Sequence, residues 1–298
     1  MTATAGPGPV SVVADGAAGA PEFVDLHSHS TASDGALAPH AVVETAVAAG
    51  LAAFALTDHD TLAGVPAAQD AGRRLGIRVV AGVELSLMDG DREVHMLGLH
   101  IARVDALQAE LEAVRDSRKS RAEEIVARLN RLGVPVTVDA VFSEAAGGAV
   151  GRPHVARALI AGGWVRDQRE AFDRFLGAGR PANVEKQRIA VADGIRLIRE
   201  CGGIAIIAHP GADGRRERIE PLVALGLDGL EVRHPGHSAE DMLRIEALAD
   251  HFGLVKSGGS DWHGASAGPR VLGGMRVPRE WLDLQDARVG QRRADAVG

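Results

Sequence analysis

The sequence predicts an α/β barrel interrupted by an all-α insertion, and three observations support this. Short apolar runs alternate with amphipathic helical segments, which is typical of a parallel sheet covered by helices. Most of these runs end in His, Asp or Glu, as where residues 204–208 precede His209. The alternation then stops after Ile101 and gives way to a long helical period. An α/β barrel gathers the C-terminal ends of its strands on one face, so such scattered residues can form one site.

The barrel is expected to comprise residues 23–102 and 190–285. Pro39 suits the first turn of a helix, and Gly76 and Gly253 suit the residue that follows a helix. Together with the apolar periodicity, these signals predict barrel helices over residues 39–49, 63–75, 191–201, 216–225 and 239–252.

Residues 103–189 are expected to form the insertion, as a helical cap over the barrel mouth. Apolar residues between 104 and 132, among them Leu107, Leu111, Ile125 and Leu129, recur with a helical period. Shorter helices are expected near residues 139–146, 153–161 and 167–177. The terminal segments, residues 1–22 and 286–298, are expected to be flexible tails.

The composition limits the possible functions. The chain is 46% hydrophobic and 24% charged, as in ordinary globular proteins. A net charge of −7 argues against general nucleic-acid binding, and an aromatic content of 3% without any Tyr argues against recognition by base stacking. The single cysteine, Cys201, permits no intrachain disulfide and fits a cytoplasmic location. No segment approaches the length of a membrane-spanning helix.

Nine potential metal ligands are spread over six clusters of the sequence. They are His27, His29, Asp34, His59, Glu84, His95, His209, Asp261 and His263. Imidazole and carboxylate ligands without thiolate suit Zn, Mn or Fe. Because one ion takes about four to six ligands, the set indicates two or three divalent ions that share a bridging carboxylate. The alternative is that these are unrelated polar residues at strand ends, which fits a single His pair better than it fits the whole set.

The clusters form recognisable motifs. They read Asp-Leu-His-Ser-His-Ser at 25–30, Ser-Asp-Gly at 33–35, Thr-Asp-His-Asp at 57–60, Gly-Val-Glu at 82–84, Glu-Val-His-Met-Leu-Gly at 93–98, Ala-His-Pro at 208–210 and Gly-Ser-Asp-Trp-His at 259–263. In this order they resemble the PHP (polymerase and histidinol phosphatase) superfamily of metal-dependent phosphoesterases. The resemblance implies a distorted (β/α)7-type barrel with a trinuclear site on its C-terminal face.

The resemblance also implies how the ligands are shared. One ion would be held by His27, His29, Glu84 and Asp261, a second by Glu84, His95 and His209, and a third by Asp34, His59 and His263. Asp34, His59, Glu84 and His263 are expected to serve the catalytic step. Asp58 and Asp60 are expected to orient ligand histidines from behind.

A narrower resemblance rests on Thr-Asp-His-Asp-Thr-Leu-Ala-Gly at 57–64 and Gly-Arg-Pro-His-Val-Ala-Arg-Ala-Leu at 151–159. Both are similar to the branch that includes 3',5'-nucleoside bisphosphate phosphatases, AMP-forming phosphoesterases and RNase AM, which carries a helical insertion. The chain departs from that branch at Arg233 and within residues 181–184, where relatives carry aromatic residues. These departures leave the substrate open.

Candidate substrate-binding residues are cationic and come from two places. They are Arg118, Arg121, Arg152 and His154 in the insertion, and His234 and His237 after the apolar run 229–232. Guanidinium groups bind phosphate in a bidentate manner, and a helix that begins near Pro153 favours anions. The alternative for Arg118 and Arg121 is a solvated helix face.

The sequence therefore predicts a phosphomonoesterase that acts on a small nucleotide, most directly a 3',5'-nucleoside bisphosphate, through a metal-bridging hydroxide. The alternatives are a 5'-to-3' exoribonuclease acting on short RNA, a histidinol-phosphate-type phosphatase, and a non-catalytic accessory PHP domain. The last is disfavoured because all nine ligand positions are retained. The expected partner is a small nucleotide or short oligonucleotide, without stable duplex DNA binding or membrane contact. The oligomeric state is left open.

Overall fold

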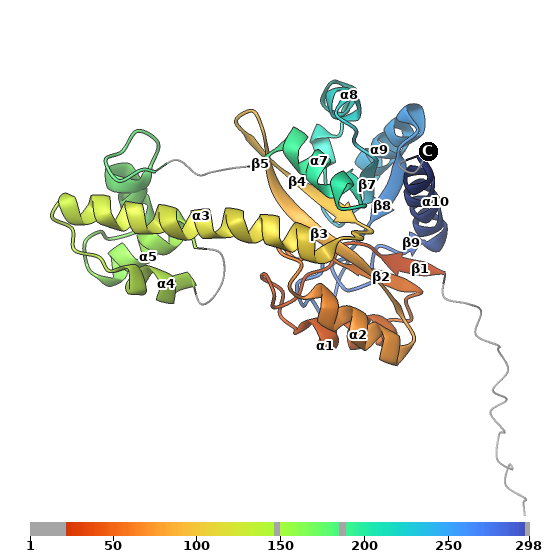
Figure 1. Ribbon diagram of the computed structural model, residues 1–298, viewed down its shortest axis with the longest axis horizontal. Coiled ribbons are helices and arrows are strands. Elements are labelled where there is room, and N and C mark those ends of the chain that lie inside the picture. Colours follow the sequence, from red (N-terminus) through yellow and green to blue (C-terminus); the bar gives the residue numbers. More distant parts are fainter. Residues whose placement is uncertain (1–21, 146–149, 185–188, 296–298) are drawn as a thin grey trace, which may run out of the picture.

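The computed structural model describes residues 22–145, 150–184 and 189–295, and its centre is a curved nine-stranded sheet (Figure 1). The strands are β1 (Phe23–Asp25), β2 (Ala53–Leu56), β3 (Arg78–Asp89), β4 (Arg92–Leu99), β5 (Ile189–Ala190), β6 (Ile204–Ile207), β7 (Gly229–Arg233), β8 (Val255–Gly258) and β9 (Val277–Pro278). Their order is β8-β7-β6-β4-β3-β2-β1-β9, with β5 paired to β3. Leu26 N–H, just after β1, donates to the Gly258 carbonyl of β8 at 3.0 Å, so β1 and β8 meet and the barrel is nearly closed. The predicted α/β barrel is confirmed.

Two strands depart from the expected parallel arrangement, the two-residue β9, which is antiparallel to β1, and β4. β4 runs antiparallel to both β3 and β6, whereas β1, β2 and β3 are parallel, as are β6, β7 and β8. Only Gly90 and Asp91 separate β3 from β4, and Gly90 has φ +60°. Parallel neighbours need a crossover of a dozen or more residues, so this short connection can only form a hairpin.

Six helices cover the barrel strands among the described residues. They are α1 (Pro39–Ala48), α2 (Val65–Leu75), α7 (Val191–Glu200), α8 (Arg216–Ala224), α9 (Ala239–Phe252) and α10 (Arg279–Asp295). The first five agree with the expected ranges to within two residues. Gly76 and Gly253 follow α2 and α9 with φ of 73° and 62°, a left-handed conformation that glycine adopts without steric penalty.

The sixth helix corrects the expected flexible tail over residues 286–298, because α10 continues to Asp295. Trp281 packs into the barrel core, and Gln285 is fully buried and donates to a β8 carbonyl at 2.8 Å. Asp286 accepts two hydrogen bonds from the Arg78 guanidinium, at 2.6 and 2.7 Å. These long-range contacts fix a segment whose own sequence carries little signal.

The insertion has a hydrophobic core of its own. Leu107 and Leu111, near the start of α3 (Val104–Arg131), are buried in the barrel core, whereas Ile125 and Leu129 are buried in a second core. That second core also includes residues of α4 (Val138–Ala145), α5 (Arg152–Ala161), α6 (Gln168–Ala171) and the π-helical turn η1 (Phe172–Leu176). We call this part the helical unit.

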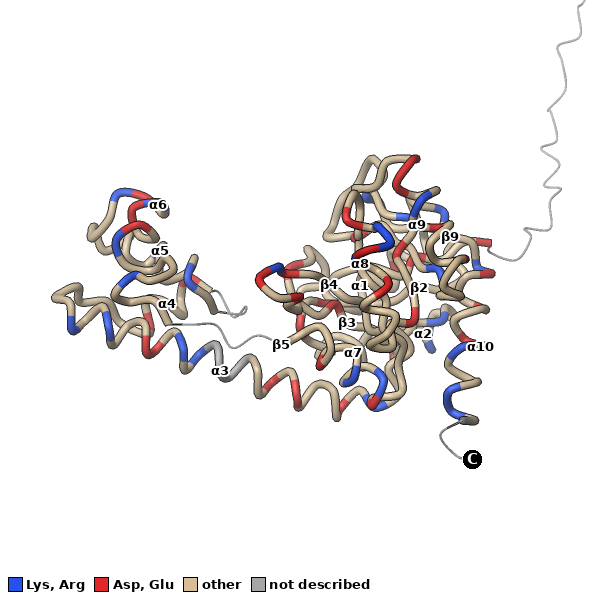
Figure 2. The backbone as a smooth tube through the Cα atoms, turned by 90° about the horizontal axis from the view of Figure 1, so that it is seen from above, with Lys and Arg blue, Asp and Glu red and all other residues tan. Residues whose placement is uncertain are grey.

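The helical unit lies at the far end of α3, and two perpendicular views show it apart from the sheet (Figures 1 and 2). This placement differs from the expected cap packed over the barrel mouth. The physical reason is that the unit buries its apolar side chains in its own core and does not need the strand ends to cover them.

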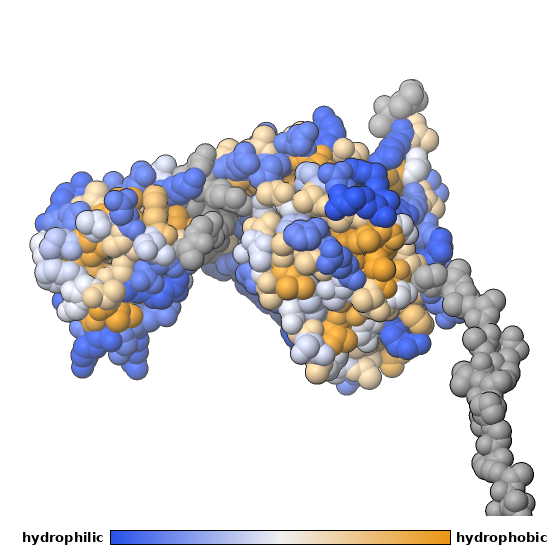
Figure 3. Space-filling model, turned by 90° about the horizontal axis from the view of Figure 1, so that it is seen from below, coloured by the Kyte–Doolittle hydropathy of each residue, from blue (hydrophilic) through white to orange (hydrophobic). Residues whose placement is uncertain are grey.

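One face of the molecule shows both hydrophilic and hydrophobic side chains on its two parts (Figure 3). In the face drawn in Figure 3, hydrophilic side chains cover the helical unit and much of the barrel, with smaller hydrophobic patches between them. Over the described ranges, none of the helices combines the length and the apolar character that crossing a membrane requires.

Candidate metal centre

All nine predicted ligands lie close together on one side of the barrel. His27 and His29 follow β1, with Asp34 in the next turn of the chain, and His59 follows β2. His209 follows β6, and Asp261 and His263 follow β8. Glu84 and His95 lie within β3 and β4, because this hairpin extends beyond the level at which the other strands end.

Glu84 occupies the middle of the cluster and is 1% exposed. Five imidazole nitrogens lie between 2.8 and 3.3 Å from its carboxylate oxygens. The nitrogens facing Oε2 belong to His27, His29 and His59, and those facing Oε1 belong to His95 and His209. Burial opposes ionisation, but the surrounding imidazoles, His27 foremost, hold the pKa of Glu84 well below its usual range. Each oxygen thus faces a different group of histidines, which is the arrangement of a bridging carboxylate.

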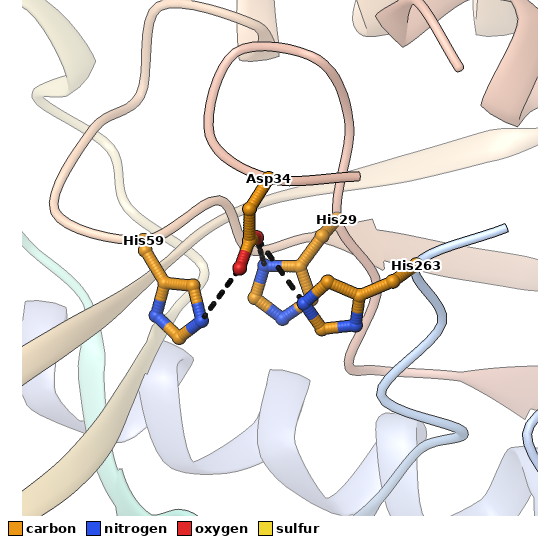
Figure 4. Close-up of side chains that lie close together, drawn as sticks. All are labelled: His29, Asp34, His59 and His263. Carbon is orange, nitrogen blue, oxygen red and sulfur yellow. Dashed lines mark ion pairs between the residues drawn. The ribbon is translucent and has the colours of Figure 1, made fainter. Parts of the chain in front are cut away.

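Asp34 organises a second group at the more exposed side (Figure 4). Its Oδ1 lies 3.2 Å from His263 Nε2, and its Oδ2 lies 3.8 Å from His59 Nε2. The buried His29 completes the group, with its Nδ1 3.8 Å from Asp34 Oδ1. The hydrogen bond from His263 lowers the pKa of Asp34 to about 2, so the carboxylate is ionised at neutral pH.

Asp261 joins the buried histidines to the rim. Its Oδ1 lies 3.2 Å from His29 Nε2, while its Oδ2 lies 3.4 Å from His234 Nε2 and 2.7 Å from Arg270 Nη1. Burial raises the pKa of this carboxyl, but the hydrogen bond from His234, the imidazoles and Arg270 together hold it well below the usual range. Arg270, which is 48% exposed, was not among the sequence candidates, since an isolated Arg after Gly-Pro carries no motif signal.

His29 shows that the site fits metal ions. Its ring is fully buried, and neither nitrogen makes a hydrogen bond, although carboxylates of Asp34, Glu84 and Asp261 surround it. A buried polar atom without a partner is unfavourable, and cations between the ring and these carboxylates would satisfy both nitrogens. The donor set of imidazoles and carboxylates is the one that divalent transition ions accept.

Among the described residues, the potential metal ligands form three groups, and within each group the ligand atoms lie within 4.8 Å of one another. They are His27, His29, Glu84 and Asp261; His29, Asp34, His59 and His263; and His59, Glu84 and His95. The first group equals one set implied by the family resemblance, and the second contains another. The third differs because it includes His59 in place of His209, whose Nε2 lies 3.0 Å from Glu84 Oε1.

A fully buried carboxylate that the sequence analysis missed supports the ligands. Glu231 in β7 lies with Oε1 2.9 Å from His27 Nδ1, and its Oε2 accepts the His209 N–H at 2.6 Å. Burial raises the pKa of Glu231, but the adjacent His27 lowers it by more. The pKa of Glu231 therefore lies below its usual value, and the carboxylate is ionised at neutral pH. Glu231 therefore accepts a hydrogen bond from the Nδ1–H of His27, and the Nε2 of His27 remains available to bind a metal. The available signal was a single charged residue in an apolar strand.

Asp58 supports the loop that carries Asp34. Its carboxylate accepts hydrogen bonds from Ser30 N–H, Ser30 Oγ and Ser33 Oγ, each at 2.7 Å. Asp60 accepts the Ser86 N–H at 2.9 Å and so attaches its loop to β3. The structure thus gives Asp58 a role in fixing the loop, where the sequence suggested that it orients a ligand histidine.

His234 and His237 have both ring nitrogens engaged by the protein. His234 Nδ1 accepts the Gly236 N–H at 3.0 Å, so its Nε2 carries the proton that faces Asp261. His237 Nδ1 donates to a β7 carbonyl at 2.8 Å, and its Nε2 accepts the Gly211 N–H at 3.0 Å. Both rings thus use their nitrogens within the protein, and their expected contact with substrate stays a prediction. His237 instead holds the turn that follows His209.

The candidates in the insertion have partners within the helical unit. Arg121 Nε donates to a main-chain carbonyl at 2.7 Å, and Arg152 Nη1 donates to Asn183 Oδ1 at 3.3 Å. His154 Nδ1 accepts the N–H of the residue that precedes α5, at 2.9 Å. The side chain of Arg118 lies outside the described residues. The structure does not bring Arg121, Arg152 or His154 to the metal cluster, and their contact with substrate stays a prediction.

Comparison with known proteins identifies the family. Residues 25–135 match the PHP domain. The chain is 39% identical to a 3',5'-nucleoside bisphosphate phosphatase from Chromobacterium violaceum over 84% of this chain and 90% of that protein. It is 38% identical to a 5'-3' exoribonuclease from Haemophilus influenzae over 80% of this chain and 89% of that protein. A solved structure from Bifidobacterium adolescentis, assigned to the metal-dependent phosphoesterases, superposes with a TM-score of 0.68 at 30% identity and covers 90% of this chain and 96% of its own. The chain belongs to the PHP family of metal-dependent phosphoesterases and is an enzyme that hydrolyses phosphoester bonds.

Proposed function

We propose that this enzyme is a phosphomonoesterase acting on a small phosphorylated nucleotide, most directly a 3',5'-nucleoside bisphosphate. The observation that carries the proposal is Glu84, which presents its two oxygens to separate groups of imidazoles. The proposal is also supported by the relative from Chromobacterium violaceum, which is 39% identical and is named a 3',5'-nucleoside bisphosphate phosphatase.

The ligand geometry supports a centre of two or three divalent ions of Mn, Zn or Fe, held by the nine residues in the sets given above. When bound, such ions supply a nucleophilic hydroxide at neutral pH and neutralise phosphoryl oxygens. The chain's own residues divide into a floor and a rim. His27, His29 and Glu84 are at most 1% exposed and form the floor.

The rim is open to substrate. The side chains of His59, His263 and Asp34 are 27%, 34% and 57% exposed. A phosphoryl group can therefore approach from the side of Asp34, His59 and His263, and the floor excludes water from behind. The assignment of Asp34, His59 and His263 to the catalytic step rests on this position between the buried floor and solvent. The assignment of Glu84 rests on its two oxygens, which face separate groups of imidazoles.

A 5'-to-3' exoribonuclease is the second candidate, because the Haemophilus influenzae relative carries that name. A long polyanion needs a basic track that continues away from the reacting phosphate. A cleft opens beside His95 and His209, and in it Arg92 is paired with Asp213 and Arg218 with Asp89, while Glu93 adds a third carboxylate. This balance of charge favours a small ligand.

The test is phosphate release by purified protein supplied with Mn. The substrates are 3',5'-nucleoside bisphosphates, 5'-mononucleotides, histidinol phosphate and a short 5'-phosphorylated RNA. We expect the highest kcat/KM on a bisphosphate. Faster turnover of the RNA with release of mononucleotides would establish the exoribonuclease, and turnover of histidinol phosphate alone would refute the nucleotide assignment.

A further inference from the structure

A cleft of about 360 Å³ opens beside two of the predicted metal ligands. His95 and His209 form its inner end, and both side chains are partly exposed, at 29% and 31%. One wall is the outer half of the β3–β4 hairpin, and the other is the chain from the end of β6 into α8. The cleft is therefore continuous with the metal cluster and lies on its β6 side.

Two ion pairs cross the outer part of the cleft. Arg92 on the hairpin pairs with Asp213, and Arg218 on α8 pairs with Asp89 at 3.2 Å. The four side chains are between 39% and 61% exposed. The hairpin wall thus carries Arg92, Asp89 and Glu93, and the other wall carries Arg218 and Asp213. Each Arg faces an Asp of the opposite wall.

Exposed ion pairs of this kind contribute little to stability, because water and salt screen them. A phosphate offers the same guanidinium groups more acceptor oxygens and a higher charge than a carboxylate does. A phosphate that entered between the walls could therefore replace Asp213 and Asp89 as the partner of Arg92 and Arg218.

The lining of the cleft suits the group that links two phosphates. Val94, Pro210 and Leu222 also line the cleft and give it aliphatic surface. A cavity of this volume is in the usual size range for a nucleoside-sized ligand. The cleft thus combines two of the predicted metal ligands, an aliphatic lining and a pair of arginines.

We infer that this cleft binds the nucleoside part of the substrate and that Arg92 and Arg218 bind its second, unreacted phosphate. This inference rests on the proposed function and names the residues that select a bisphosphate over a monophosphate. It differs from the sequence expectation that Arg152 of the insertion binds substrate, because Arg152 is engaged by Asn183 within the helical unit.

The experiment compares kcat/KM for adenosine 3',5'-bisphosphate with that for 4-nitrophenyl phosphate, using the full chain with Mn. The variants are Arg218→Ala and Arg92→Ala, with Arg216→Ala as the matched control. Arg216 lies on the same helix, pairs with Glu220 at 3.3 Å and does not line the cleft. Arg152→Ala is measured alongside.

We expect the ratio of the two kcat/KM values to fall about ten- to a hundred-fold in Arg218→Ala and in Arg92→Ala, and to stay unchanged in Arg216→Ala. A ratio that stays at the wild-type value in both cleft variants, or that falls only in Arg152→Ala, overturns the inference. Wild-type protein that hydrolyses the aryl phosphate but not the bisphosphate refutes the proposed function itself.

A second variant covers the case in which an Arg→Ala change disturbs folding. Asp89→Asn combined with Asp213→Asn keeps both guanidinium groups and removes the carboxylates that compete with phosphate. We expect a several-fold lower KM for the bisphosphate in this double variant. An unchanged or higher KM would show that the arginines do not receive the phosphate.

Discussion

Glu231 and His27 form a fully buried pair, in which the carboxylate Oε1 lies 2.9 Å from the imidazole Nδ1. The pair fixes the tautomer of His27, because a proton on Nδ1 leaves the lone pair of Nε2 for a metal ion on the side of Glu84 and Asp261. The other oxygen of Glu231 accepts the backbone N–H of His209. One side chain behind the cluster thus positions ligands from β1 and from the loop after β6.

Glu231→Gln is predicted to weaken metal binding about ten- to a hundred-fold. The amide has only one acceptor oxygen, so it cannot accept hydrogen bonds from both His27 and His209 as the carboxylate does. Equilibrium dialysis against Mn or Zn measures this affinity. Glu246→Gln is the control, since Glu246 is 40% exposed and pairs with Lys256. If Glu231→Gln keeps the wild-type melting temperature and the wild-type affinity, the positioning role is wrong.

Glu84→Ala is predicted to remove most of the bound metal and nearly all activity, because its carboxylate faces both groups of imidazoles. Asp34→Ala is predicted to remove only the ion nearest His59 and His263 and to retain partial metal content. Elemental analysis of protein purified without chelator measures the number of ions per chain. Near-normal turnover and metal content in Glu84→Ala would contradict the bridging arrangement.

Asp58→Ala is predicted to release the loop that carries Asp34, because three hydrogen-bond donors of Ser30 and Ser33 lose their acceptor. Ser30 is buried, and the loss of the acceptor for its N–H and hydroxyl should lower the free energy of unfolding by about 1–3 kcal/mol. Denaturant unfolding measures this, and metal analysis should show the loss of the ion near Asp34. Asp70→Ala on exposed α2 is the control. Unfolding that matches the wild type would exclude the role in supporting the loop.

The pair between Arg78 and Asp286 predicts a pH dependence of stability. The hydrogen bond from Arg78 lowers the pKa of Asp286 in the folded state. The ionised carboxylate therefore stabilises the folded state at pH values above about 3.9, the pKa of Asp in the unfolded chain. This stabilisation is lost as the pH falls through the lower pKa that Asp286 has in the folded state. Since both side chains are partly exposed, we expect Asp286→Asn to cost about 0.2–1 kcal/mol at neutral pH.

Chemical unfolding of wild type and Asp286→Asn between neutral and strongly acidic pH measures this difference. The two stabilities should converge on the acid side. A difference that grows as pH falls would have the wrong sign for a carboxylate with a lowered pKa. Asp283→Asn, one turn earlier on α10, is the control, because Asp283 is 62% exposed.

Local features of the sequence were enough to predict the barrel helices, the two ends of α3 and the nine residues of the cluster. Pro39 and Gly253 act within a few residues of their own positions, and apolar periodicity is a property of one segment. His, Asp and Glu after apolar runs indicate that strand ends carry polar groups, whatever the order of the strands. These local features predict the structure correctly because they do not depend on the rest of the chain.

The tertiary structure alone decided which atoms face one another. β4 is antiparallel because a two-residue connection forces a hairpin, and this places His95 next to Glu84. Glu231 supports His27 only because the barrel closes and brings β7 behind β1. The helical unit stands apart because its residues can bury one another, and α10 is ordered by contacts with β3 and β8. Each of these depends on pairs of residues far apart in the chain, where periodicity and motif spacing carry no information.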